Sequence, residues 1–209
     1  HTLWGSSMAA LWRGTPHSYT RDASEMVTKR EDYVRNAGQF DTLVLTESLP
    51  VAWAAKNEYS AYYLRRFACP LVEANPQARV FLYQTWVNFQ GLDPNATPLP
   101  PYKFDWRSEM LAQRAVWEEI ADDASKPDVR TPGGWLSRLG WTSTGNGGCD
   151  AEFSVSIIPV GDALVALADR IANPHAGDIL TWPDGKPLAM ADFFANPYAE
   201  YPGCPICSC

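Results

Sequence analysis

Polar side chains that could hold or activate a substrate follow two short apolar runs of this chain. Glu47 and Ser48 come directly after the first run, and Trp86 and Asn88 follow the second. A carboxylate, a hydroxyl, an amide and an indole can together orient a small ligand in a cleft. These four residues are therefore candidate site residues if the fold brings the ends of the two runs together.

A strand–helix–strand order is predicted to position them. Residues 42–46 and 80–85 are rich in Val, Leu and aromatic residues and are too short for helices, and a helical pattern lies between them at 59–71. A crossover of this length requires the two strands to be parallel. Ligands of open α/β sheets collect at the carboxyl ends of such strands, where the four candidates lie.

A third unit repeats this order. A strand is predicted at 153–158 and a helix at 163–172, with Asp162 as the N-cap of that helix. Three such units predict an α/β sandwich with a mostly parallel sheet. Because three strands make a narrow sheet, one or two more are expected, from residues 1–18, from the tail or from chain beyond this sequence.

Local signals predict the remaining elements. Asn57 is expected to cap the helix before the second strand, and Pro70 is expected to kink or divide that helix. The Gly- and Trp-rich segment 126–150 is expected to be a long loop. Two further helices are predicted, at 23–37 and 105–122.

Length and charge restrict the function classes. The 209 residues suit one domain, and a net charge of −7 argues against nucleic acid or an anionic membrane as a partner. No apolar run approaches the roughly 20 residues that span a bilayer. A small molecule is the expected partner. The start at His1 rather than Met leads us to expect a processed product or a piece of a longer chain, with the domain incomplete at both ends.

Three of the five cysteines, Cys204, Cys207 and Cys209, crowd the Cys-rich tail at 197–209. A structural zinc site draws about four ligands, usually from two paired clusters, and only one cluster exists here. A disulfide is therefore favoured over a metal site, and no metal is expected. Disulfides point to a secreted or periplasmic protein, in which an odd count leaves one thiol without a partner in the chain.

Several segments resemble one family. They are Asp41–Glu47, Asn75–Trp86, Met110–Ala124 and Ile158–Ala163. Over residues 38–172 the chain resembles SGNH/GDSL-type hydrolases, in particular a bacterial branch of that family. The resemblance implies a flavodoxin-like three-layer α/β sandwich and a serine esterase that needs no cofactor. The implied substrate is a carboxylic ester, such as an acylated carbohydrate, hydrolysed through an acyl-enzyme.

The family's catalytic blocks suggest site residues here. In the Gly5-Ser6-Ser7-Met8 segment, Ser7 is the candidate nucleophile. In a second interpretation this segment is the family's next block, Gly5 is an oxyanion donor, and the nucleophile lies upstream. The family's late Asp-x-x-His block does not occur in the sequence. His175, with Asp178 three positions after it, is the candidate base.

Two other classes remain open. One is an inactive SGNH-like binding scaffold or fragment, which the missing Asp-x-x-His block favours. The other is a copper-dependent oxidative polysaccharide enzyme, in which the amine and imidazole of an N-terminal His1 would bind the metal. Enzymes of that class are β-sandwiches, whereas the periodicity of this chain is that of an α/β protein.

Overall fold

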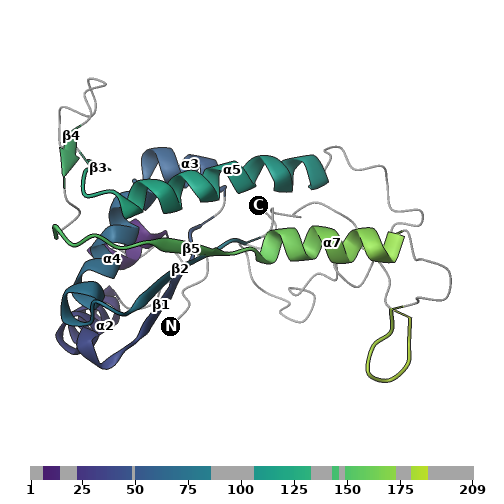
Figure 1. Cartoon of the computed structure of the whole chain (residues 1–209), viewed down its shortest axis with the longest axis horizontal. Coiled ribbons are helices and arrows are strands. Elements are labelled where there is room, and N and C mark those ends of the chain that lie inside the picture. The colour runs from purple at the N-terminus through teal and green to yellow at the C-terminus, as the bar shows by residue number, and fades with distance from the viewer. Residues whose placement is uncertain are drawn as a thin grey trace.

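The protein is described by a computed structural model that covers residues 7–14, 23–48, 50–85, 106–132, 143–145, 149–172 and 180–187. Helices and strands alternate over most of this length (Figure 1). In chain order the elements are α1 (Met8–Arg13), α2 (Ala23–Asn36), the 3-10 helix η1 (Ala37–Gln39), β1 (Thr42–Leu45), α3 (Val51–Asn57), α4 (Ser60–Ala74), β2 (Arg79–Tyr83), α5 (Trp106–Ser125), β3 (Val129–Thr131), β4 (Ser143–Gly145), β5 (Val155–Ile158) and α7 (Val160–Ala172).

The main sheet of the described residues has the strand order β1-β2-β5, and both pairings are parallel. Leu45 of β1 pairs with Leu82 of β2, and Tyr83 of β2 pairs with Ile158 of β5. Helices α3 and α4 connect the first two strands, and α5 lies between the second and third. A parallel sheet flanked by helices is consistent with a three-layer arrangement, so the predicted α/β class is confirmed.

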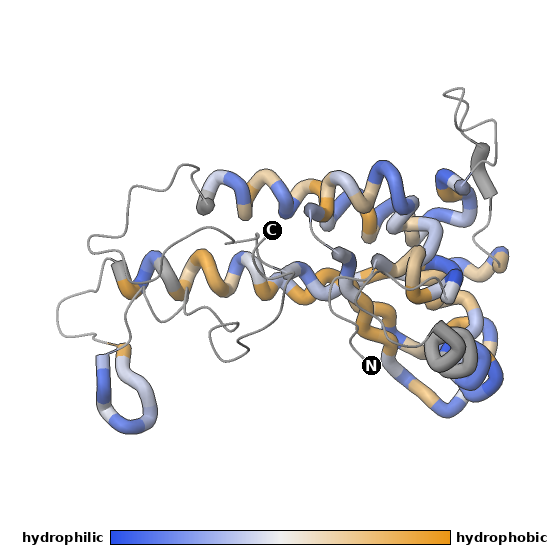
Figure 2. Tube along the Cα trace, turned by 180° about the vertical axis from the view of Figure 1, so that it is seen from behind, coloured by the Kyte–Doolittle hydropathy of each residue, from blue (hydrophilic) through white to orange (hydrophobic). Residues whose placement is uncertain are grey.

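One face of the sheet carries the main hydrophobic core. Leu82 packs there with Leu64 of α4, Trp117 and Ile120 of α5, and Met8 of α1, all of them buried. Val80 lies two residues before Leu82 and so faces the same side, where it packs against α4. Hydrophobic residues gather along the strands in Figure 2. Buried residues thus alternate along β2, and the face that they form packs against α1, α4 and α5.

The junction before α4 differs from the prediction. Asn57 is the last residue of α3, where its side-chain amide donates to the carbonyl of Trp53 (2.9 Å), so it does not cap α4. Tyr59 occupies the cap position with φ 57° and ψ 50° and provides no side-chain hydrogen bond. The prediction was wrong here because the pattern did not reveal that a separate helix, α3, precedes the break.

Helix α4 also continues through Pro70 to Ala74 and is not divided. A proline inside a helix removes one backbone hydrogen bond. Buried residues on both sides of it, among them Cys69, Leu71 and Val72, hold the last turns against the rest of the protein. Tertiary packing therefore outweighs the local signal of Pro70.

Two further differences concern the second half of the chain. Helix α7 begins at Val160, so Asp162 lies in its first turn rather than at the predicted N-cap position. Within the predicted loop 126–150, β3 and β4 form a small antiparallel sheet in which Thr131 pairs with Ser143. Strands of three residues carry too little alternation to be recognised from the sequence.

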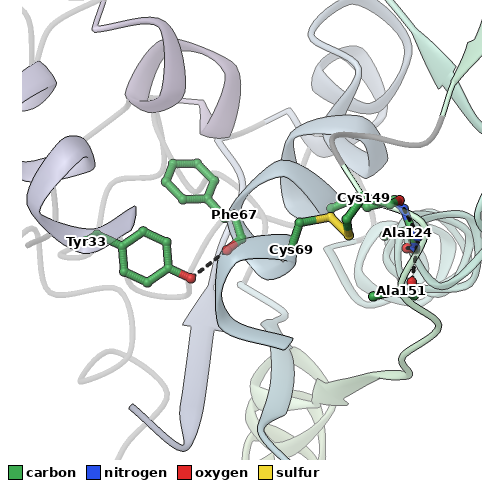
Figure 3. The surroundings of a disulfide bond; sticks show 7 residues. Tyr33, Phe67, Cys69, Ala124, Cys149 and Ala151 are labelled. Carbon is green, nitrogen blue, oxygen red and sulfur yellow. Dashed lines mark hydrogen bonds between the residues drawn. A yellow bond between two sulfur atoms is a disulfide. The ribbon is translucent and has the colours of Figure 1, made fainter. Parts of the chain in front are cut away.

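A disulfide bond (Figure 3) and a buried arginine tie α4 to the segment before β5. Cys69 of α4 is bonded to Cys149, 80 residues further along the chain. Arg65, one turn earlier and fully buried, donates to the carbonyls of Ala124 (3.1 Å), Cys149 (3.1 Å) and Ala151 (2.7 Å). The expected disulfide is thus confirmed, whereas the tail cysteines lie outside the described residues.

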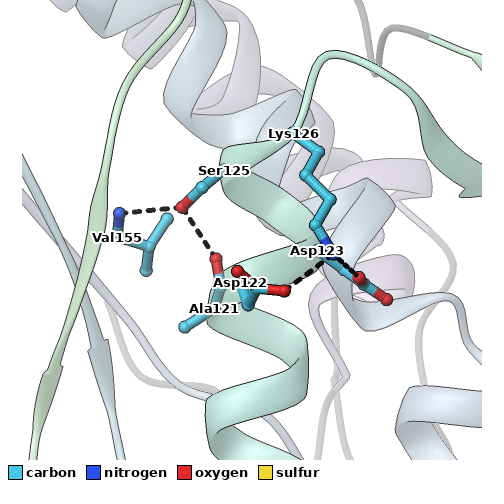
Figure 4. A network of polar contacts seen from close by, with 6 residues as sticks. All are labelled: Ala121, Asp122, Asp123, Ser125, Lys126 and Val155. Carbon is cyan, nitrogen blue, oxygen red and sulfur yellow. Dashed lines mark hydrogen bonds and ion pairs between the residues drawn. The ribbon is translucent and has the colours of Figure 1, made fainter.

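Ser125 makes a second link into β5, at the end of α5 (Figure 4). Its hydroxyl donates to the carbonyl of Ala121 (2.8 Å) and accepts from the amide of Val155 (3.1 Å). Lys126 pairs with Asp122 (2.7 Å) and Asp123 (2.8 Å) on the exposed side of the same turn. The hydrogen bond from Val155 to Ser125 therefore fixes the start of β5 against the end of α5.

Candidate functional site

Glu47 lies just beyond the carboxyl end of β1 and meets the start of α1. It is only 3% exposed, and its Oε1 accepts from the amides of Ser48 (2.7 Å) and Met8 (3.1 Å). The Met8 amide belongs to the first turn of α1, whose N–H groups have no partner within the helix. Glu47 therefore joins Met8, at the start of α1, to the carboxyl edge of the sheet, across 39 positions in the sequence.

Ser7 is the N-cap residue of α1. Its Oγ accepts from the amide of Ala10 (3.2 Å) and donates to Oε2 of Glu58 (3.4 Å), and the residue is 1% exposed. These are the contacts of a helix cap that also faces a carboxylate. A catalytic serine needs an accessible Oγ and a base within reach, so the nucleophile role of Ser7 stays a prediction.

Two residues that the sequence did not single out, Glu58 and Ser60, complete this group. They flank Tyr59, whose left-handed backbone costs about 1–2 kcal/mol for a residue other than glycine. The guanidinium of Arg130, from β3, lies 5.2 Å from the centre of the Tyr59 ring. Glu58, next to this strained residue, accepts the hydrogen bond from Ser7, and strained backbone of this kind concentrates at functional sites.

We call Ser7, Glu47, Ser48, Glu58 and Ser60 the Glu47 cluster. Oε2 of Glu47 and Oγ of Ser60 are both buried, and neither has a partner within hydrogen-bond geometry among the described residues. The two groups nevertheless lie close enough for the Ser60 hydroxyl to favour the charged carboxylate. A small displacement would let Ser60 donate to Glu47.

Burial changes the acid–base behaviour of Glu47. Loss of solvation raises the pKa of Glu47 above its ordinary value of 4.5, because the charged form is the one penalised. The Ser60 hydroxyl and the two amide donors oppose part of this rise. A carboxyl group with a raised pKa keeps its proton to a higher pH than an exposed carboxyl group does, and shifted pKa values of this kind are frequent in active sites.

A second polar group lies at the ends of β2 and β5. Gln84 is 1% exposed, its side-chain amide nitrogen donates to Asp162 (3.4 Å), and Asp162 pairs with Arg114 of α5 (3.0 Å). The side-chain oxygen of Gln84 is buried with no partner in the part of the chain that the structure describes. We call Gln84, Arg114 and Asp162 the Gln84 group.

Gly161 allows this group to form. A Cβ atom at position 161 would lie 3.0 Å from the carbonyl oxygen of Thr85 and 3.1 Å from Cδ of Gln84. Only a glycine therefore lets the first turn of α7 approach the end of β2 so closely. The sequence prediction missed Gln84 because it extended the strand to residue 85, whereas β2 ends at Tyr83.

Only part of the predicted site lies within the described residues. Glu47 and Ser48 follow β1 as expected, and Ser7 lies beside them. Sequence reasoning had no signal that joined Glu58 or Ser60 to Ser7, apart from their position between two helical patterns. Four candidates lie outside the described residues, namely Gly5, Trp86, Asn88 and His175, as do His1 and His17.

The described residues contain no group of three or more His, Cys, Asp or Glu side chains arranged to hold a metal ion. Among the described helices, none has the length and apolar character needed to cross a bilayer.

The fold and this edge of the sheet define an α/β protein with a candidate ligand site at the position typical of parallel sheets. Comparisons of the chain with known protein families, with curated proteins and with solved structures found no match.

Proposed function

We propose that this chain is a serine-type hydrolase of the SGNH kind that cleaves a carboxylic ester at the carboxyl edge of the sheet. The observation that carries the proposal is the hydrogen bond from the Met8 amide to Glu47, which joins the Ser7-Met8 part of the early serine block to the end of β1. The resemblance implies that these two segments build one site. An acylated carbohydrate is the substrate class that we favour.

The second group supports the same proposal. The resemblance implies a glycine and a polar residue at later strand ends, which hold the oxyanion. Gly161 and Gln84 are such a pair, just past the ends of β5 and β2, and a Cβ atom at position 161 would lie 3.1 Å from Cδ of Gln84. Fixed donors aimed at a developing oxyanion stabilise the transition state of acyl transfer.

The proposed reaction proceeds through an acyl-enzyme. A serine Oγ attacks the ester carbonyl carbon, its proton passes to a base, and the alcohol leaves with a proton. Water then hydrolyses the acyl-enzyme and releases the carboxylic acid. If Ser7 is the nucleophile, its Oγ must leave its contact with the Ala10 amide, and Glu58 is the proton acceptor already facing it. His175 remains the base predicted from the sequence.

The Cys69–Cys149 disulfide supports a secreted or periplasmic location for this proposed enzyme, since such bonds persist in oxidising compartments.

A second candidate function is binding without turnover. The burial of Ser7 and its use as a helix cap favour this alternative, because a capped hydroxyl at 1% exposure is poorly placed for attack. The acidic and amide side chains of the edge would then only orient a sugar or an ester.

Labelling with a fluorophosphonate, followed by intact mass and peptide mapping, distinguishes the two functions. The hydrolase proposal predicts one adduct per chain and hydrolysis of p-nitrophenyl acetate that the adduct abolishes. Ser156→Ala, an exposed position on β5, is the matched control and should label normally. An adduct that maps to a serine other than Ser7 would assign Ser7 to capping alone. A folded sample without any adduct would overturn the hydrolase proposal and favour the binding scaffold.

A further inference from the structure

A pocket of about 410 Å3 lies between α1, α2 and α4 and shares no lining residue with the Glu47 cluster or the Gln84 group. Its lining residues are Trp12, Arg30, Glu31, Val34, Arg35 and Arg66. Pockets of roughly 300–1,000 Å3 accommodate small organic ligands. The pocket is therefore large enough for a molecule with one or two rings.

Contacts with neighbouring helices fix the indole of Trp12 in this pocket. The Phe67 ring meets it edge-on, with ring centres 4.9 Å apart, and Arg30 donates to the Trp12 carbonyl (2.5 Å). The Tyr33 hydroxyl in turn donates to the carbonyl of Phe67 (2.5 Å), and burial raises the pKa of Tyr33 to about 12 (Figure 3). The apolar wall of the pocket is thus formed before any ligand enters.

Positive charge surrounds this wall. The guanidinium carbons of Arg66 and Arg30 lie 4.8 Å and 5.8 Å from the centre of the Trp12 ring. Arg30 pairs with Glu31 (3.5 Å), and Arg35 pairs with Asp32 (3.2 Å). Among the described residues Arg66 has no carboxylate partner. Three arginines against one glutamate make the lining cationic, although the chain as a whole carries −7.

We propose that this pocket binds a small organic carboxylate with an apolar body. A guanidinium group can donate two parallel hydrogen bonds to a carboxylate, which an ammonium group cannot match in geometry. Arg66 would bind the carboxylate, while Trp12 and Val34 would contact the apolar body. Inorganic phosphate or sulfate would use only the charged part of the pocket. This inference does not depend on the proposed esterase activity.

The test compares 2-naphthoate with 2-naphthamide, which has the same rings and a neutral polar group. Calorimetric titration of the whole chain should show saturable binding of naphthoate and at least tenfold weaker binding of the amide. Arg66→Gln should weaken naphthoate binding about tenfold, because one charge-assisted hydrogen-bonding group is lost. Arg66→Lys keeps the positive charge but loses the planar guanidinium group. Its affinity for naphthoate should therefore lie between those of the natural chain and Arg66→Gln.

Arg79→Gln is the matched control, since Arg79 is exposed on β2, stacks on Phe81 and does not line the pocket. Naphthoate should bind to this variant as to the natural chain. Circular dichroism establishes that each variant is folded. The proposal is overturned if naphthoate binding does not saturate or if 2-naphthamide binds equally well. It is also overturned if the folded Arg66→Gln variant keeps the full affinity for naphthoate.

Discussion

At the scale of single residues, Glu47 and Ser7 are buried polar groups at the edge of the sheet, and both make hydrogen bonds there. A buried carboxyl group is costly when charged, and Glu47 meets that cost with two backbone amides and a nearby serine. Ser7 uses its hydroxyl twice, as the acceptor of a helix cap and as a donor to Glu58. Both residues therefore have measurable structural roles, whatever their part in catalysis.

Glu47→Gln should change how stability depends on pH. Because burial raises the pKa of Glu47 above 4.5, the folded state binds the proton more tightly than the unfolded state. Protonated Glu47 therefore stabilises the folded state relative to the charged form. This stabilisation is complete below pH 4.5 and is lost as the pH rises through the raised pKa of the folded state. Glutamine keeps an acceptor for both amides and does not titrate.

The free energy of unfolding of Glu47→Gln, relative to the natural chain, should therefore increase as the pH rises above 4.5. Urea unfolding at pH 4, 5, 6 and 7 measures it. Glu109→Gln, on an exposed position of α5, is the matched control for loss of one carboxylate. A constant difference between Glu47→Gln and the natural chain over this range would contradict the account.

Ser7→Ala should lower the free energy of unfolding by about 1 kcal/mol, because the Ala10 amide loses its acceptor at the start of α1. Urea unfolding measures this loss separately from any loss of labelling. Ser156→Ala should leave the free energy of unfolding within about 0.5 kcal/mol of the natural value. An unchanged stability for Ser7→Ala would show that the hydroxyl is not a cap in solution.

At the scale of elements, two close approaches determine how the helices meet the sheet. Arg65 connects α4 to the end of α5 and to the segment before β5 through three carbonyls. Gly161 lets α7 start directly against the end of β2. Each contact joins parts of the chain that are far apart in sequence, and each can be tested with one substitution.

Arg65→Met should destabilise the fold by about 3 kcal/mol or more. Methionine approximates the volume of the stem but leaves three carbonyls without their donor, and those of Ala124 and Cys149 belong to buried residues, so they carry a desolvation cost. Arg79→Met removes an exposed arginine and should change stability by less than about 0.5 kcal/mol. Chemical unfolding of the two variants should separate them clearly, and equal losses would contradict the role assigned to Arg65.

Gly161→Ala should cost about 1–3 kcal/mol through overpacking. The new Cβ would lie 2.6 Å from Cε of Met110 and 3.0 Å from the carbonyl oxygen of Thr85. The methionine end can move, whereas the backbone oxygen cannot move without disturbing the sheet edge. Adding Met110→Ala should therefore not restore the natural stability. Gly185→Ala, where no atom lies within 4 Å but φ is +84°, tests backbone strain without crowding. A folded Gly161→Ala chain of natural stability would contradict the close approach.

At the scale of the whole molecule, the Cys69–Cys149 disulfide spans much of the α/β core. It closes a loop of 80 residues that contains β2 and α5. Loop-closure entropy predicts a stabilisation of about 4.5 kcal/mol for a loop of this length. The double variant Cys69→Ala with Cys149→Ala should melt at a correspondingly lower temperature, and reducing agent should then have little further effect on its melting. A double variant that melts like the oxidised chain would contradict this role.

The α/β class could be predicted because its signals are local. Each of the three sheet strands is a short apolar run, and the helical pattern at 59–71 requires a parallel crossover between the first two. Glu47 and Ser48 could be named as candidates because their position depends only on where β1 ends.

The rest of the site depends on contacts between distant segments. No pattern in the sequence indicates that Glu58 faces Ser7, that Arg65 reaches three carbonyls more than 50 positions away, or that Gln84 is buried against Gly161. Cys69 and Cys149 could be counted but not paired, because spacing alone does not determine connectivity.

The most direct test of the proposed ester hydrolase is the stoichiometry of fluorophosphonate labelling on the folded chain, measured by intact mass. We expect one adduct per chain, formed at the same rate in Ser156→Ala and accompanied by complete loss of p-nitrophenyl acetate hydrolysis. A folded chain that forms no adduct and hydrolyses no ester would contradict it.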